Sequence, residues 1–267
     1  MHVHQYSLIL LYAFIVYRDP DPFELLSFQF ERPPCCDDTT EEKDNKVIDI
    51  QIRGYKKNAD EVWQSTGLTL WRASDYLCQY QMENMQLFQN GKILELGAGL
   101  GLNGILAWKS TSSPNSEVCI TDGDSEALVH LRENVERNRI ADGDGNNNAG
   151  KVSCHQLIWG KESSIKFLDN VANNQRYDVI LASDIIYSPV IVQPLWETVE
   201  TLLKKPRSDD EEGGVFIMSY ARRKVDVSIE LVLEKAVEYG FVYKLVKEDE
   251  EDGIWVYTFR FREEKRP

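Results

Sequence analysis

The chain of 267 residues is poor in the side chains that hold metals and disulfide frameworks. It contains five cysteines, none of them in a C-x-x-C arrangement, and its four histidines are dispersed. This usage argues against a disulfide scaffold, a structural zinc site and a histidine-based triad, so we expect no bound metal. It favours a reducing, intracellular compartment. We expect the cytoplasm, with the nucleus as the alternative.

Long apolar runs are also scarce. The most apolar stretch, residues 6–17, has 12 residues, whereas a helix needs roughly 20 to span a bilayer. It lacks the basic leading region and the small-residue cleavage site of a signal peptide. We therefore expect no membrane anchor and interpret this stretch as a buried strand or a docking segment.

Positive charge is in deficit. The chain has 30 lysines and arginines against 44 aspartates and glutamates, a formal net charge of −14. Nucleic acid is therefore a poor partner, and a protein with a basic surface is a plausible one. Two acidic runs, residues 209–212 and 248–252, are interpreted as solvated loops. The sequence contains no feature that indicates an oligomeric state.

What the chain does carry is an alternation of short apolar runs with helical patterns. Five such runs, which we predict to be strands, lie at residues 92–96, 117–121, 151–158, 177–182 and 214–219. Two further strands, residues 241–247 and 254–262, are joined by a short acidic turn and must pair antiparallel. The pattern predicts an α/β fold with a doubly wound, Rossmann-like, mostly parallel seven-stranded sheet that ends in an antiparallel hairpin.

The amino-terminal part departs from this pattern. Prolines at positions 20, 22, 33 and 34 and a polar acidic stretch after them indicate a loosely ordered segment. We expect residues 1–46 to form an arm that is partly disordered or docked. Residues 47–267 are expected to form one domain, which begins with a half-exposed strand at residues 47–55.

The most informative stretch is KILELGAGLGLNG, residues 92–104, which reads as a strand, a glycine turn and the start of a helix. Gly99, Gly101 and Gly104 satisfy the dinucleotide fingerprint G-x-G-x-x-G. Read from Glu95, the same stretch is E-x-G-x-G-x-G. A carboxylate there would repel a pyrophosphate and would help to hold the ammonium and sulfonium of S-adenosylmethionine, directly or through the loop. The sequence therefore favours a methyl donor over a dinucleotide.

Four more motifs accompany the glycine loop in a fixed order along the chain. They are STGLTLW at residues 65–71, TDG at 121–123, LIWG at 157–160 and ASDIIY at 182–187. Together the five resemble the methyltransferase-16 group of class I, seven-β-strand protein-lysine N-methyltransferases, over roughly residues 47–262. The resemblance implies an enzyme that transfers a methyl group from S-adenosyl-L-methionine to a lysine side chain of a protein substrate.

The resemblance also implies a cofactor site. Asp122 is expected to accept both ribose hydroxyls, a task for which Asp124 is the alternative. Trp159 is expected to lie beside the adenine, and Ala182 is expected to line the pocket because small size is needed there. The implied cofactor-binding residues are Trp71, Glu95, Gly97, Ala98, Gly99, Asp122, Trp159 and Ala182.

The D-x-x-Y motif, from Asp184 to Tyr187, carries the hypothesis about the substrate. A carboxylate stabilises an ammonium and so opposes its deprotonation, and we therefore expect Asp184 to bind and orient the amine and not to act as a general base. Tyr187 is expected to supply an aromatic wall to a lysine channel. Alternatively, Asp184 caps the next helix and Tyr187 packs in the core. Another acceptor (a histidine, an amino terminus or a small molecule) and a catalytically silent scaffold also stay open.

Overall fold

The computed structural model describes residues 22–32, 47–56, 66–141, 150–206, 213–223 and 227–263. The apolar segment of residues 6–17 and the acidic run of residues 209–212 lie outside this part. At the centre of the described structure lies a seven-stranded sheet with the strand order β5-β4-β3-β6-β7-β9-β8. The strands are β3 (Lys92–Glu95), β4 (Glu117–Asp122), β5 (Lys151–Gln156), β6 (Val179–Ser183), β7 (Val215–Ala221), β8 (Phe241–Asp249) and β9 (Ile254–Phe261).

The topology of this sheet confirms the predicted fold class. The strands β3 to β7 pair in parallel with one another where they are neighbours in the sheet, and β9 pairs antiparallel with β7 on one side and β8 on the other. The chain builds β3, β4 and β5 toward one edge and then returns to place β6 on the other side of β3. Such a reversal opens a crevice at the carboxyl ends of the two central strands, which is where open α/β sheets bind ligands.

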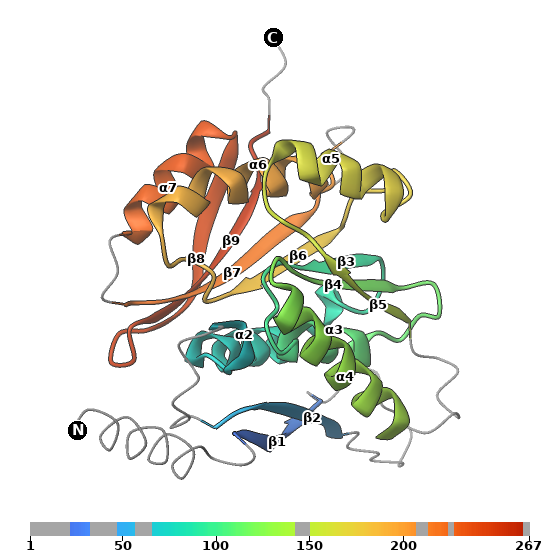
Figure 1. The fold of residues 1–267 in the computed structure, drawn as a ribbon. Coiled ribbons are helices and arrows are strands. Elements are labelled where there is room, and N and C mark those ends of the chain that lie inside the picture. Colours follow the sequence, from blue (N-terminus) through green and yellow to red (C-terminus); the bar gives the residue numbers. More distant parts are fainter. Residues whose placement is uncertain are drawn as a thin grey trace, which may run out of the picture.

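Helices cover both faces of the sheet (Figure 1). On one face lie α2 (Arg72–Glu83), α3 (Leu102–Ser110) and α4 (Ser125–Ala141), and on the other lie α5 (Lys161–Asn170), α6 (Val192–Leu202) and α7 (Ile229–Glu238). The helix α5 buries only Ser164 and Phe167. No helix in the described part of the chain is long and apolar enough to cross a membrane.

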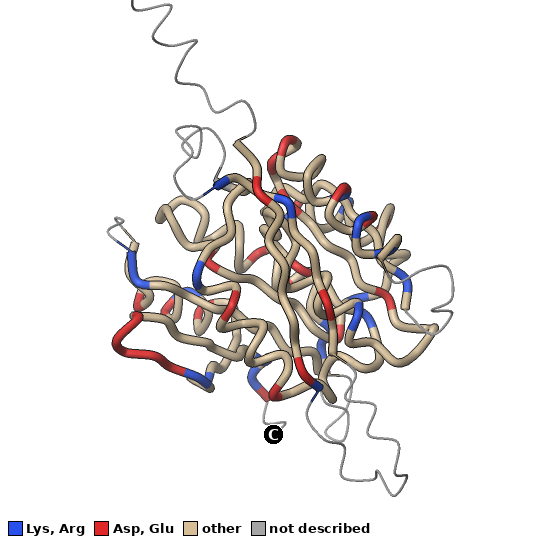
Figure 2. The backbone as a smooth tube through the Cα atoms, turned by 90° about the horizontal axis from the view of Figure 1, so that it is seen from below, with Lys and Arg blue, Asp and Glu red and all other residues tan. Residues whose placement is uncertain are grey.

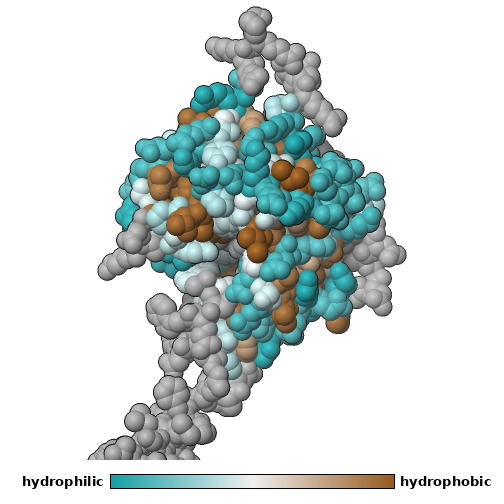
Figure 3. Space-filling model, turned by 45° about the horizontal axis from the view of Figure 1, so that its top comes forward, coloured by the Kyte–Doolittle hydropathy of each residue, from teal (hydrophilic) through white to brown (hydrophobic). Residues whose placement is uncertain are grey.

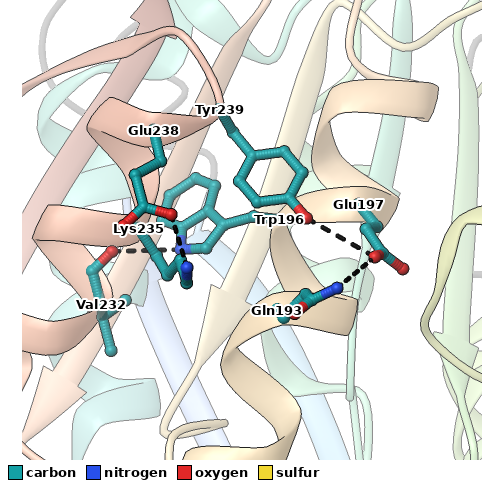
Figure 4. Close-up of polar contacts among 7 residues, drawn as sticks. All are labelled: Gln193, Trp196, Glu197, Val232, Lys235, Glu238 and Tyr239. Carbon is teal, nitrogen blue, oxygen red and sulfur yellow. Dashed lines mark hydrogen bonds and ion pairs between the residues drawn. The ribbon is translucent and has the colours of Figure 1, made fainter.

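Polar contacts join α6 to α7 on the second face (Figure 4). The buried indole of Trp196 donates a hydrogen bond from Nε1 to the carbonyl of Val232 at 3.1 Å. Tyr239, just after α7, donates to the carboxylate of Glu197 at 3.5 Å, and Gln193 donates to the same oxygen at 2.9 Å. These bonds hold α6 in place, and α6 in turn anchors a loop of the cavity described below.

A separate two-stranded ribbon packs outside α3 and α4 (Figure 1). It pairs β1 (Phe23–Glu31) antiparallel with β2 (Val47–Tyr55). The expectation of a loosely ordered segment is therefore wrong for residues 23–31, where the flanking prolines obscured an alternating apolar pattern. The strand predicted at residues 47–55 is confirmed. The division into an arm of residues 1–46 and a domain of residues 47–267 stays a prediction.

Two asparagines of α4 bind the free edge of β2 as a neighbouring strand would. Asn134 accepts from the amide of Arg53 at 2.8 Å and donates to the carbonyls of Arg53 and Leu100 at 3.2 and 3.1 Å. Asn138, one turn later, binds the amide and the carbonyl of Gln51. Both asparagines are buried, so they satisfy backbone groups that would otherwise lack partners. Through Leu100 they also connect the ribbon to the glycine loop.

Charge and hydropathy vary over the surface. On the face that Figure 3 shows, apolar side chains form separate patches among polar ones. Residues 248–252, which end β8 and begin the connection to β9, form a continuous acidic run that we call the acidic turn (Figure 2). We expected a solvated loop here, but part of the acidic turn contacts α2. Tyr76 of α2 donates to Asp249 at 2.5 Å and to Asp252 at 2.9 Å, and Arg72 pairs with Asp252. The acidic turn is thus attached to the first turn of α2.

We predict that Asn134→Ala lowers the free energy of unfolding by about 1–3 kcal/mol, because it removes the side-chain partner of part-buried backbone groups of residue 53 and of the buried carbonyl of residue 100. Urea denaturation measures the change. Asn170→Ala, at an exposed position at the end of α5, is the matched control and is expected to cost less than about 0.5 kcal/mol. Equal losses in the two variants would contradict this account of the ribbon.

Candidate active site

A cavity of about 520 Å³ lies at the carboxyl ends of β3, β4 and β6, where the strand order reverses. This volume falls within the range of roughly 300–1,000 Å³ that small-molecule sites occupy. The structure brings together eight of the predicted site residues in its wall, namely Trp71, Gly97, Ala98, Gly99, Asp122, Trp159, Asp184 and Tyr187. The two others, Glu95 and Ala182, do not line it.

The glycine loop forms one wall with bare backbone. Gly97 and Gly99 have φ angles of 61° and 52°, in the left-handed region that favours glycine. A Cβ on Gly97 would lie 2.9 Å from a methyl of Ile185, and one on Gly99 would lie 2.8 Å from the carbonyl oxygen of Gly67. The loop can therefore follow this path along the cavity only because both residues lack side chains.

Asp122 ties the end of β4 to this loop. One carboxylate oxygen accepts from the amide of Gly99 at 2.8 Å and the other from the amide of Asp124 at 2.9 Å. The side chain is buried, which raises its pKa above the ordinary value. Each oxygen keeps lone-pair capacity for a ligand hydroxyl in the cavity. Asp124 also lines the cavity, but its carboxylate accepts from the amide of Glu126 at the start of α4.

Two indoles face the cavity from different elements. Trp71 directly precedes α2, and Trp159 lies in the loop after β5. The residues after Trp159 are anchored on α6, because the amide of Gly160 donates to Thr198 at 2.9 Å and that of Lys161 donates to Glu197 at 3.1 Å. The contacts of α6 in Figure 4 therefore help to position an aromatic wall of the cavity.

Glu95 lies beneath the loop and not in the cavity. It is fully buried, its carboxyl accepts from the amide of Gly104 at 2.8 Å, and burial raises its pKa to about 8. Of the two routes that the sequence left open, a direct contact and an effect through the loop, this position is compatible only with the second. The charge argument against a pyrophosphate has no support in this position, because the carboxyl lies outside the cavity wall and its burial favours the neutral form.

Ala182 was also placed wrongly. It is fully buried in the core between the sheet and α6, and the next residue, Ser183, lines the cavity instead. Successive side chains of a strand point to opposite faces, so an error of one position moves a residue from the cavity to the core. Sequence motifs near a strand end do not resolve that difference.

Sequence reasoning missed the residue that orients Ser183. Asn103, the second residue of α3, is buried and donates to the hydroxyl oxygens of Ser74 at 2.7 Å and Ser183 at 3.1 Å. Both serines line the cavity, and because their oxygens accept from Asn103, their hydroxyl protons are free to point elsewhere. The available signal was a lone amide side chain inside an otherwise apolar helix, LNGILAWKS.

Asp184 is bound mainly by groups of the chain itself. It adopts a φ of 58°, and its side chain is only 3% exposed. The amides of Ala73 and Ala221 donate to its carboxylate, and Arg223 pairs with it at 2.5 Å. Burial raises its pKa, and Arg223 partly offsets that effect. The carboxylate does cap a helix, but the helix is α2 and not the one that follows the motif.

Tyr187 and Arg223 complete the wall. Tyr187 is 56% exposed and lines the cavity, so the alternative of a core tyrosine is wrong. Arg223 places its guanidinium 4.0 Å from the centre of the Trp71 ring. Arg223 carries no recognisable signal in the sequence, because it stands in the polar stretch ARRK at the end of β7, which resembles a solvated surface.

The family model and the curated relatives that match this chain are described in agreeing terms. A family model described as lysine methyltransferase matches residues 43–232, which is more than two thirds of the chain. A calmodulin-lysine N-methyltransferase of Arabidopsis thaliana is 24% identical over 72% of this chain and 56% of its own length. The protein-lysine N-methyltransferase EFM3 of Chaetomium thermophilum is 30% identical over 66% and 48%.

A third relative has a broader name. The protein N-terminal and lysine N-methyltransferase EFM7 of Cryptococcus neoformans is 29% identical over 58% of this chain and 51% of its own length. The matched part of this chain spans about half the length of these curated relatives.

The buried carboxyl of Glu95 predicts a pH dependence of stability. Its folded-state pKa of about 8 lies above the ordinary 4.5, so between these values the folded protein keeps a proton that the unfolded chain releases. This contribution to stability is complete below pH 4.5 and is lost as the pH rises through about 8. Glu95→Gln, which stays neutral, is expected to gain on the order of 3 kcal/mol relative to wild type between pH 5 and pH 8.

Denaturant unfolding at several pH values measures this gain. Glu136→Gln, at an exposed position on α4, is the control and is expected to change little with pH. A constant difference between Glu95→Gln and wild type across the range would mean that Glu95 is ionised in the folded protein.

Proposed function

Because the chain belongs to the lysine methyltransferase family, we propose that this protein transfers a methyl group from S-adenosyl-L-methionine to a lysine side chain of a protein. The observation that carries the proposal is the combination, in one cavity at the reversal of the strand order, of the bare glycine backbone, the Asp122 carboxylate and two indoles. Family membership, and not the charge of Glu95, supports the methyl donor over a dinucleotide.

The residues of the cavity fit S-adenosyl-L-methionine. Asp122 has lone-pair capacity for the ribose hydroxyls while its two amide bonds keep it in place. Trp159 offers an indole face for the adenine. Gly97 and Gly99 present backbone to the methionine part. The cofactor supplies an electrophilic methyl carbon on its sulfonium, and the chain supplies position, from which most of the rate of such a displacement comes.

A protein with a basic surface around the acceptor lysine is the substrate we favour. The net charge of −14 supports it, and so does the acidic turn of residues 248–252, which α2 holds through Arg72, the residue next to Trp71 of the cavity. Tyr187 is exposed at the cavity and is suited to flank the aliphatic part of a lysine. We propose neither a nucleic acid nor a membrane as a partner.

An amino-terminal amine of a protein is the second candidate acceptor. It is the same kind of nucleophile as a lysine amine, and the relative from Cryptococcus neoformans is named for both. For the compartment we propose the cytoplasm, with the nucleus as the alternative. The cysteine usage supports this choice, since Cys78, Cys119 and Cys154 are free thiols.

Labelling of a lysate tests the proposal directly. Lysate from cells that lack the protein is incubated with the purified chain and methyl-labelled S-adenosyl-L-methionine, and mass spectrometry locates the added methyl groups. We expect them on lysine. Label on an amino terminus would select the second candidate. Label on histidine or a small molecule would contradict the proposal, and cofactor binding without any transfer would indicate a silent scaffold.

We predict that Asp122→Ala weakens the binding of S-adenosyl-L-methionine at least about tenfold, because it removes both the ribose acceptor and the bond to the amide of Gly99. Isothermal titration calorimetry measures the dissociation constant. Asp169→Ala, exposed on α5, is the control and is expected to bind as wild type does. If Asp124→Ala lost affinity and Asp122→Ala did not, the ribose would be assigned to Asp124.

A further inference from the structure

A resident cation occupies the part of the cavity in which the substrate amine was expected. The guanidinium of Arg223 lies between the Trp71 ring, 4.0 Å from its centre, and the Asp184 carboxylate, 2.5 Å from Oδ2. The side chain is 21% exposed and lines the cavity, so it belongs to the wall and not to the outer surface. It is the second residue after the end of β7.

The donors around Asp184 leave little room for another cation. Its carboxylate accepts from the amides of Ala73 and Ala221 as well as from Arg223, and its side chain is nearly inaccessible to solvent. The carboxylate and the guanidinium together carry no net charge. A lysine that enters the cavity as an ammonium would therefore find no uncompensated negative charge here and would have a guanidinium as its neighbour.

We propose that Arg223 is a positioning residue that sets the protonation state of the acceptor: by pairing with Asp184, it makes the cavity accept the lysine as a neutral amine. This inference rests on the proposed function. The methyl transfer requires a neutral amine, because the nitrogen lone pair forms the new bond to the methyl carbon. At the same time the carbon–sulfur bond breaks and its electron pair goes to sulfur. The methylated ammonium then loses a proton to solvent.

The magnitudes show why the pairing matters. A free lysine has a pKa of about 10.4, so only about one molecule in a few thousand is neutral at pH 7. An unpaired carboxylate within about 4–6 Å favours the charged form and raises the pKa of an amine by about 1–3. Without Arg223, Asp184 would act in that way on the bound lysine. The neutral fraction would fall by a further factor of about ten or more.

Other charged and titratable groups surround this pair, and they stay the same in every variant below except the control variant of Arg222. Arg72 of α2 is paired with Asp252, and Arg222 stacks on Trp255 at 4.8 Å. Burial raises the pKa of Tyr220 on β7, next to the pair. Further titratable groups on the adjoining elements include Asp75 of α2, Tyr187 of the loop after β6 and Glu230 of α7, and Asp122 lies elsewhere in the cavity wall. Residues 224–226 lie outside the described part of the chain.

The pH dependence of a single turnover tests the inference. The enzyme is used in excess over the lysate protein that the wild-type chain labels, so that the rate constant reports the bound complex. In Arg223→Gln we expect the acid limb of the rate profile to move up by about one pH unit or more, with a rate at pH 7 about tenfold lower. The enzyme concentration for half-maximal rate is expected to stay the same or to fall, because the ammonium now binds Asp184.

Three further variants separate charge from packing. Arg223→Lys keeps the positive charge and is expected to keep the acid limb of wild type. The double variant Asp184→Asn with Arg223→Gln removes both charges and is expected to return the limb to its wild-type position. Arg222→Gln is the matched control on the neighbouring residue, with no expected change. Calorimetric binding of S-adenosyl-L-methionine and thermal melting verify that each variant is folded, and Arg223→Met replaces Arg223→Gln if that variant does not fold.

An unchanged acid limb in Arg223→Gln would overturn the inference. So would a loss of cofactor affinity without a shift of the limb, since that result would assign Arg223 to the cofactor instead. A failure of the proposed function is distinguishable from either, because the wild-type chain would then label no lysine or amino terminus at any pH.

Discussion

The arrangement of the cavity depends on one buried carboxylate that needs donors. Asp184 stands at the end of β6 with almost no access to solvent, and an ionised carboxylate in such a place must be hydrogen-bonded and paired. Its donors come from the first turn of α2, from the end of β7 and from Arg223. Satisfying this one group therefore brings three elements, far apart in the sequence, to the same corner of the sheet and places Trp71 beside the cavity.

A second buried polar group supports the opposite wall. Glu95 holds the amide of Gly104 beneath the glycine loop, and Asn103 beside it binds Ser74 and Ser183. Because these groups are buried, each must be satisfied by a specific partner, and the partners lie on β3, α2, α3 and β6. The backbone of the loop is thus fixed from below by polar contacts and kept free of side chains above by its glycines. A ligand in the cavity meets a wall that is already ordered.

How much of this was predictable from the sequence follows from the range of each signal. The glycine loop was recognisable from its own residues, whereas the family resemblance implied Asp122, Trp159 and Tyr187, each of which belongs to a short motif next to a predicted strand end. Ser183 was missed because one residue decides which face of a strand a side chain occupies. Arg223 was missed because its role depends on Asp184 and Trp71, and no local pattern in ARRK records those neighbours.

The sequence by itself determined the alternation of strands and helices, the terminal hairpin and the identity of the loop that faces the cavity, because apolar periodicity and glycine spacing are local properties of the chain. Only the tertiary structure decided that Glu95 is buried beneath the loop, that residues 23–31 pair with β2, and that the carboxylate of Asp184 is bound to Arg223. Burial, strand pairing and charge compensation depend on which distant residues come together, and a linear pattern does not contain that information.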